Sequence, residues 1–160
     1  MQTVNIICIG KLKEKYLCDA IKEYSTRLTP FCKFSIIELD EYRLPDKPSD
    51  AQIKNCLEEE GKRILAKIQK NSFVVPMCIE GKLLSSEELS STIEDAGVSG
   101  KSTVDFIIGG SFGLSDEVKR RGDFKLSMGR MTFPHQLARV MLCEQIYRSF
   151  QIMTGGKYHK

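Results

Sequence analysis

Short apolar runs recur along this chain, separated by longer stretches in which apolar and polar positions alternate with helical spacing. Four runs have the length of buried strands and end near turn residues. They are residues 4–9 (VNIICI), 34–39, 73–79 (FVVPMCI) and 103–108 (TVDFII). A fifth, shorter strand is expected over 124–127. The runs predict a sheet that is buried on both faces.

The stretches between the strands predict amphipathic helices. The expected helices cover residues 14–28, 50–69, 85–95, 116–121 and a last one that begins near Pro134. Ser49 and Ser115 can cap two of them, and Ser85 with Glu88 forms a capping box for a third. Strands that alternate with helices in this way predict an α/β fold with a mostly parallel sheet.

Breaks between these elements are also predicted. Pro76 lies inside the third run and cannot donate to a ladder, so this strand is expected at an edge or at a break where a ligand comes close. Residues 80–82 are expected to turn the chain and 97–100 to link a helix to the next strand. The polar loop 40–49 is expected to be the most mobile segment.

Length and composition fit one globular domain over residues 1–160, with 41% apolar and 28% charged residues. No apolar run approaches the roughly 18 residues of a membrane span, and no basic leader opens the chain, so neither a transmembrane segment nor a signal peptide is expected. Six cysteines are scattered without a CxxC pair. This spacing argues against zinc and for buried, reduced thiols in a cytoplasmic protein.

Positive charge is concentrated in residues 126–160, which have a net charge of +4 against +3 for the whole chain. Glu144 is the only acid of this segment and can pair with Arg148 one helical turn later. The chain ends in GGKYHK, whose lysines suit phosphate and whose Tyr158 and His159 suit stacking on an unpaired base. A frayed basic terminus explains the same residues.

Two loops that contain glycine follow strands. Gly109–Gly113 (GGSFG) lies between a strand and a helix, where backbone amides reach ligands, or is a tight turn that needs positive φ. Its GGxxG spacing differs from the dinucleotide fingerprint GxGxxG, and no Walker-type lysine follows. Met128–Phe133 (MGRMTF) can wall an apolar slot for a flat ring, or can be core that leads into the last helix.

The last helix is apolar on more than one face, because Val140 and Met141 do not share a stripe with Leu142 and Ile146. Such a helix is buried on both sides, either by a second subunit in a two-fold dimer or as a central helix of one domain. His135 follows the proline at its start and can cap, pack or serve a site.

Three segments resemble the RlmH (YbeA-type) methyltransferases of the SPOUT class. They are GKLKEKY at 10–16, FIIGGSFGL at 106–114 and MTFPHQLARVMLCEQIYRSFQIMTGGKYH at 131–159. The resemblance covers essentially the whole chain. It implies a homodimer, a deep trefoil knot within roughly 73–160, S-adenosylmethionine as methyl donor and no metal. It also implies an acceptor, N3 of pseudouridine 1915 in 23S ribosomal RNA of the assembled ribosome.

Site residues follow from the same resemblance. The expected cofactor contacts are Met77, where the family usually has leucine, Gly109, Met128, Gly129, Arg130, Met131, Thr132 and Phe133. N3 carries a proton at neutral pH, so a base, a water or an electropositive surrounding must help to remove it. The candidates for this catalytic role are His135, Arg139, Tyr158 and His159, and the tail of one subunit can complete the other's site. The expected RNA contacts are Arg139, Arg148, Lys157, Tyr158, His159 and Lys160.

Three alternatives stay open. A SPOUT-like enzyme can modify another acceptor, such as a transfer RNA base, and a protein of this fold can be a ribosome-binding factor without activity. An unrelated nucleotide-binding enzyme that uses the GGxxG turn fits less well, because it lacks an acidic ribose partner and a Walker lysine. The low net charge favours recognition of the ribosome's shape over tight binding to isolated RNA.

Overall fold

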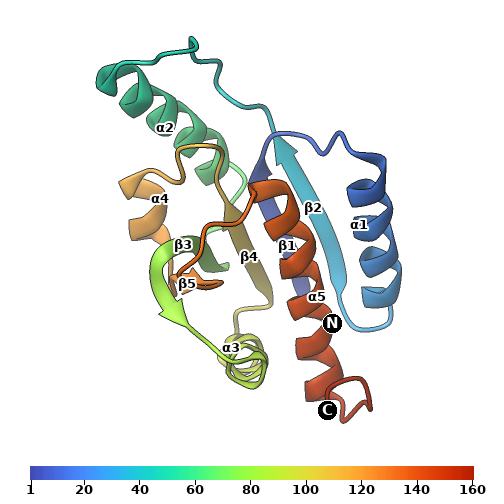
Figure 1. The fold of residues 1–160 in the computed structure, drawn as a ribbon. Coiled ribbons are helices and arrows are strands. Elements are labelled where there is room, and N and C mark those ends of the chain that lie inside the picture. The colour runs from blue at the N-terminus through green and yellow to red at the C-terminus, as the bar shows by residue number, and fades with distance from the viewer.

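The computed structural model describes residues 1–160 as helices packed on both faces of a five-stranded sheet, which confirms the predicted α/β class. All strands are parallel and lie in the order β2-β1-β4-β3-β5 (Figure 1). In chain order the elements are β1 (Thr3–Ile9), α1 (Lys15–Leu28), β2 (Lys33–Leu39), α2 (Asp50–Leu65), β3 (Phe73–Leu83), α3 (Ser86–Val98), β4 (Thr103–Ile108), α4 (Asp116–Arg121), β5 (Leu126–Ser127) and α5 (His135–Met153).

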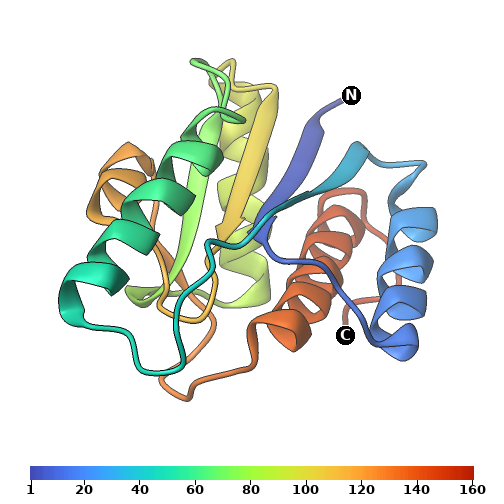
Figure 2. The same cartoon turned by 90° about the horizontal axis from the view of Figure 1, so that it is seen from above.

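Successive side chains of a strand point to opposite faces, so each strand feeds two cores. In β1, Val4, Ile6 and Cys8 belong to the core beneath α1, α3 and α5, whereas Ile7 and Ile9 belong to the core beneath α2 and α4. Figure 2 shows α2 and α4 on one side of the sheet and α1 and α5 on the other. The apolar runs of the sequence are continuous because both faces of the sheet are covered.

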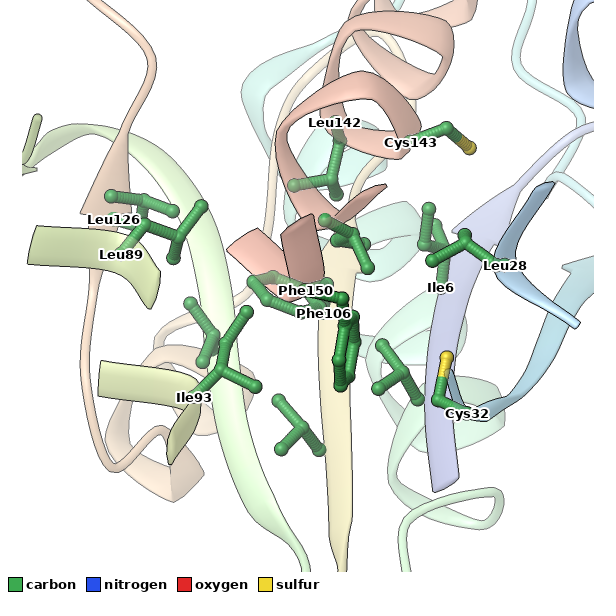
Figure 3. Close-up of a cluster of buried hydrophobic side chains, with 14 of the residues drawn as sticks. Ile6, Leu28, Cys32, Leu89, Ile93, Phe106, Leu126, Leu142, Cys143 and Phe150 are labelled. Carbon is green, nitrogen blue, oxygen red and sulfur yellow. The ribbon is translucent and has the colours of Figure 1, made fainter. Parts of the chain in front are cut away.

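The last helix, α5, packs between α1 and α3. Its Leu142 and Phe150 are buried in the larger core together with Phe106 of β4 (Figure 3). Ile146 of α5 belongs to the same core. Removing such a side chain from water stabilises the fold by about 1.5–3 kcal/mol. Leu137, on another face of α5, is 42% exposed. The chain itself therefore covers one apolar face of α5 and leaves another partly open.

The third strand departs most from the sequence prediction. It is not at an edge, because β3 lies between β4 and β5. Its pairing with β4 ends at Pro76 and its pairing with β5 begins at Met77, so the proline marks a break, which was the other expectation. The turn predicted at 80–82 is wrong: β3 continues to Leu83, and the Lys82 amide donates to the Lys125 carbonyl at 2.9 Å.

Two helix ends also differ. The helix predicted over 50–69 ends at Leu65, where the chain tightens into turns: the Lys67 amide donates to the Ile64 carbonyl at 2.9 Å and the Ile68 amide to the Leu65 carbonyl at 3.2 Å. The predicted link at 97–100 begins too early, since α3 runs to Val98 and buries Ala96. The predicted caps of α2, α3 and α4 are all present, as hydrogen bonds from backbone amides to serine hydroxyls.

All six cysteines are free, but not all are buried. Cys18 is exposed and Cys78 is half-buried, so the expectation of buried thiols is wrong for these two and right for the other four. No helix of this chain has both the length and the apolar character needed to cross a membrane. No group of three or more histidine, cysteine or acidic side chains is placed to hold a metal ion.

Candidate active site

Three segments at the carboxyl end of the sheet enclose a cavity of about 650 Å³. Two of these segments are the loops after β4 and β5, and the third is the part of β3 beyond Pro76; they meet because the carboxyl ends of parallel strands lie at one edge of the sheet. Seven of the residues expected to contact a cofactor line this cavity: Met77, Gly109, Met128, Gly129, Met131, Thr132 and Phe133. Arg130 is exposed and does not line it. Segments far apart in the sequence thus share one site.

The glycine loop at 109–113 needs its glycines for two separate reasons. A Cβ on Gly109 would collide with the carbonyl oxygen of Gly113, and Gly113 itself has φ of +84°. Gly110 and Gly113 also form an isolated antiparallel bridge. The tight turn and the ligand loop, weighed as alternatives from sequence, are therefore compatible, because the tight turn itself lines the cavity.

Side-chain hydrogen bonds hold the loop after β5 at its beginning only. Ser127 Oγ donates to the Gly129 carbonyl at 3.0 Å and accepts from the Gly129 amide at 3.2 Å. Gly129 has φ of +152°, a value that residues with a side chain rarely adopt. Met131 is 74% exposed at the cavity's rim, whereas Phe133 is half-buried and lines the wall. The loop supplies mainly apolar surface, and Thr132 contributes the one side-chain hydroxyl among its lining residues.

One pair of oppositely charged side chains lines this largely apolar cavity. Lys119 Nζ of α4 lies 2.5 Å from Glu80 Oε1 of β3. This hydrogen bond lowers the pKa of Glu80 and raises the pKa of Lys119, so both stay charged at neutral pH. Burial raises the pKa of the neighbouring Cys78 thiol, which therefore stays protonated. His135, the first residue of α5, also lines the cavity.

A second cavity of about 470 Å³ shares the wall formed by Met77, Leu126, Ser127 and Met128. It is also lined by Leu84 and Leu89 near α3 and by Val140 and Met141 of α5, together with the acid Glu144. The partly uncovered apolar face of α5 therefore opens into a hollow beside the first cavity.

The basic tail is folded back on its own subunit rather than frayed. Tyr158 Oη donates to Glu144 Oε2 at 2.9 Å, and its ring packs edge-on against Tyr147 with centroids 4.9 Å apart. His159 Nε2 lies 2.6 Å from Glu87 Oε1 at the start of α3 and lowers the pKa of that carboxyl. Arg148 lies over the Tyr158 ring at 4.6 Å. Neither aromatic residue of the tail lines the cavity of its own subunit.

The expected pair of Glu144 and Arg148 is present, with Nη2 and Oε1 2.8 Å apart. Because Arg148 also contacts His159, its guanidinium is largely engaged within the subunit. Lys157 and Lys160 are exposed and remain available for a phosphate.

Arg139 departs from the expectation of an RNA contact or a catalytic group. Its side chain is 1% exposed and paired with Glu38 at 2.9 Å, so no phosphate can reach it in this conformation. It also does not line the cavity. Burial between α5 and the strand ends explains the difference, because sequence position alone does not tell which side of a helix faces the sheet.

Three residues of this region were missed from sequence. Lys119 and Glu80 were not identified because nothing in the local sequence distinguishes them from ordinary surface charges; Glu80 lies in β3 beyond Pro76, and Lys119 lies in α4. Tyr24 of α1, whose Oη donates to Glu144 at 2.6 Å, carries no local signal at all. Its partner is 120 residues away, which only the packing of α1 on α5 brings near.

The sequence of this chain is similar to the sequences of known methyltransferases. A family model described as "Predicted SPOUT methyltransferase" matches residues 1–159. The Ribosomal RNA large subunit methyltransferase H of Clostridium acetobutylicum is 54% identical over 157 residues, covering 98% of this chain and 99% of that protein. The protein of that name from Enterococcus faecalis is 52% identical with the same coverage.

Solved structures agree at the level of fold. The tRNA (m1G37) methyltransferase from Aquifex aeolicus matches with a TM-score of 0.51 at 14% identity, covering 91% of this chain and 69% of that one. Identity this low supports the shared architecture and nothing about the substrate. Because the family model spans almost the entire sequence, this chain belongs to the SPOUT methyltransferase family.

Proposed function

We propose that this protein transfers a methyl group from S-adenosylmethionine to N3 of pseudouridine 1915 in large-subunit ribosomal RNA, on the assembled ribosome and in the cytoplasm. The observation that carries the proposal is the agreement of two results. Relatives named for ribosomal RNA methylation match 98% of the chain, and the loops expected to hold a methyl donor line one cavity.

The cavity suits such a donor. Met77, Met128 and Phe133 offer apolar surface to a flat ring, and the glycines of the Gly109–Gly113 turn expose backbone to a ligand. S-adenosylmethionine supplies a sulfonium-bound methyl group with a good leaving group already attached. The protein therefore needs to bind, orient and exclude water, which largely apolar walls favour.

Proton removal from N3 requires a group near the acceptor. His135 is the candidate that lines the cavity within one subunit. Tyr158 and His159 lie outside it, so a role for them rests on a proposed homodimer in which one tail reaches the partner's cavity. The open apolar face of α5 and the exposed Ile79 and Leu83 of β3 support such a dimer. Light scattering of the purified protein tests it, and a monomer would remove the tail from the mechanism.

RNA contact is proposed for Lys157 and Lys160, with Tyr158 and His159 as stacking surfaces and Arg148 as their support. Because the net charge of the chain is only +3, binding to isolated RNA is expected to be weak and to decrease as salt rises. Tight, salt-resistant binding to a short free hairpin would contradict this expectation.

The decisive experiment is transfer of tritium from labelled S-adenosylmethionine to ribosomes that lack the modification. Free ribosomal RNA and transfer RNA are assayed in parallel, with His135→Ala as the site variant and Glu94→Ala, an exposed helical residue, as control. Label in large-subunit RNA of intact ribosomes is expected, with loss only in the site variant. Label in transfer RNA would identify the other acceptor, and absence of donor binding would favour a factor without activity.

A further inference from the structure

Arg139 joins the start of α5 to the ends of two strands. Its Nη1 donates to Glu38 Oε2 at 2.9 Å, and its Nη2 lies 3.4 Å from the Ile9 carbonyl oxygen and 3.3 Å from that of Gly10. The same Glu38 oxygen accepts the Leu12 amide at 2.9 Å. One guanidinium therefore connects α5, the end of β1 with its following turn, and the end of β2.

No other side-chain hydrogen bond holds the chain between Gly129 and this arginine. Pro134 precedes α5 without a side-chain cap, and the bonds of Ser127 reach only as far as Gly129. Residues 131–135 nevertheless form one wall of the 650 Å³ cavity that is proposed to bind the methyl donor. The position of that wall depends on where the first turns of α5 are fixed.

Stability alone is a poor reason for a guanidinium at this place. The side chain is 1% exposed, and its Nε hydrogen has no partner. An unpaired buried donor costs about 1–3 kcal/mol, and well-packed apolar residues often replace a buried ion pair without loss. What an apolar residue cannot supply is a fixed link to a carboxylate and two carbonyls at once.

We propose that Arg139 is a positioning residue for the cavity, acting through α5 and touching neither donor nor RNA. Ala138, its neighbour, and His135, one turn earlier, both line the cavity, so a shift of the helix start displaces both. Lysine is a compact charge on a single nitrogen and cannot reproduce the fork that spans these acceptors. The identity of the donor rests on the proposed function, whereas the geometric argument does not.

Amide hydrogen exchange tests the proposal without any ligand. In Arg139→Lys and Arg139→Met, exchange of the amides of residues 138–142, the first hydrogen-bonded amides of α5, is expected to accelerate about tenfold while the amides of α3 keep their protection. If the binding-competent wall is then populated about a tenth of the time, the dissociation constant for S-adenosylmethionine rises about tenfold. Calorimetry measures that second quantity. Should the methionine variant fail to fold, the lysine variant decides.

Ile93→Ala is the matched control, because Ile93 is a buried core residue of α3 that lines neither cavity. It is expected to lower thermal stability and leave donor affinity unchanged. Unchanged exchange and affinity in Arg139→Lys would overturn the inference, as would an equal affinity loss in Ile93→Ala at matched stability. Failure of the wild-type protein to bind S-adenosylmethionine would instead refute the proposed donor, and hydrogen exchange would still decide the role of Arg139.

Discussion

Replacing Glu144 by alanine is expected to destabilise the protein and to release its C-terminal tail. The carboxylate accepts from Tyr24 Oη at 2.6 Å, from Arg148 Nη2 at 2.8 Å and from Tyr158 Oη at 2.9 Å. These donors come from α1, from α5 and from the tail. Alanine leaves all three without their acceptor, and one of them is a guanidinium.

The size of the effect follows from how exposed the cluster is. The side chains of Glu144 and Arg148 are 20% and 25% exposed. Hydrogen bonds to charged groups contribute about 1.5–3 kcal/mol each when buried, and exposed ion pairs below about 1 kcal/mol. Partial exposure puts the sum at about 2–3 kcal/mol. For a chain of this length the midpoint of thermal unfolding then decreases by roughly 5–10 °C.

The tail responds separately, because Tyr158 keeps its edge contact with Tyr147 after the hydrogen bond is lost. Losing about 1.4 kcal/mol of hydrogen bonding raises the population of the undocked tail about tenfold. Digestion by carboxypeptidase, followed by mass spectrometry, should accelerate by the same factor, since cleavage tracks the open population when opening is fast. Tyr158→Phe keeps the ring and should accelerate digestion with a smaller loss of thermal stability.

Glu94→Ala is the control, because Glu94 is an exposed acid of α3 that forms no ion pair or side-chain hydrogen bond. It should change neither the midpoint nor the digestion rate. If Glu144→Ala also left both unchanged, the carboxylate would not hold the tail, and the reasoning from its three donors would be refuted.

Three further results are expected. Bound S-adenosylmethionine should protect Cys78, which lines the cavity, from alkylation and leave exposed Cys18 reactive; equal labelling with and without donor would contradict this. Gly109→Ala should weaken donor binding at least tenfold in calorimetry, because its Cβ meets the Gly113 carbonyl, and unchanged affinity would disprove the clash. Burial raises the pKa of three thiols from 9.0, to about 11 for Cys8 and Cys32 and about 12 for Cys143. As pH rises, these thiols ionise in the unfolded chain before they do so in the folded protein. The free energy of unfolding should therefore stay constant below pH 9 and decrease between pH 9 and 11, by up to about 1.4 kcal/mol per pH unit for each thiol. Urea titrations at the two pH values measure this difference.

Local signals in the sequence sufficed for the elements whose ends are set by their own residues. The bounds of β4 were predicted correctly, and so were the serine caps of α2, α3 and α4, because a hydroxyl three residues before a free amide is a local arrangement. The wrong turn at 80–82 had a different cause. Pairing with β5 extends β3, and the partner lies more than forty residues away in sequence, beyond any local pattern.

The candidate site divides in the same way. Strand-end loops were found from sequence because Gly109 and Gly129 sit where parallel strands end, and the structure brings both loops to one cavity. The ion pair of Lys119 and Glu80 was not found, because neither charge is unusual until α4 packs beside β3. Residue type indicates what a loop can do, whereas the partners of its charges are set by tertiary packing.

The basic C-terminal segment shows most clearly that tertiary packing decides which charges are free. The net charge of +4 over residues 126–160 predicts a basic surface, yet two of its five cations are not free to meet a polyanion. Arg139 is buried against Glu38, and Arg148 is paired with the only acid of the segment. The cations left exposed are Arg130, Lys157 and Lys160. This segment therefore offers fewer free charges for counterion release than its composition suggests, and under the proposed function we expect shape and the position of the target base to contribute most of the selectivity. The buried arginine is better understood as a part of the scaffold that keeps the donor cavity in place.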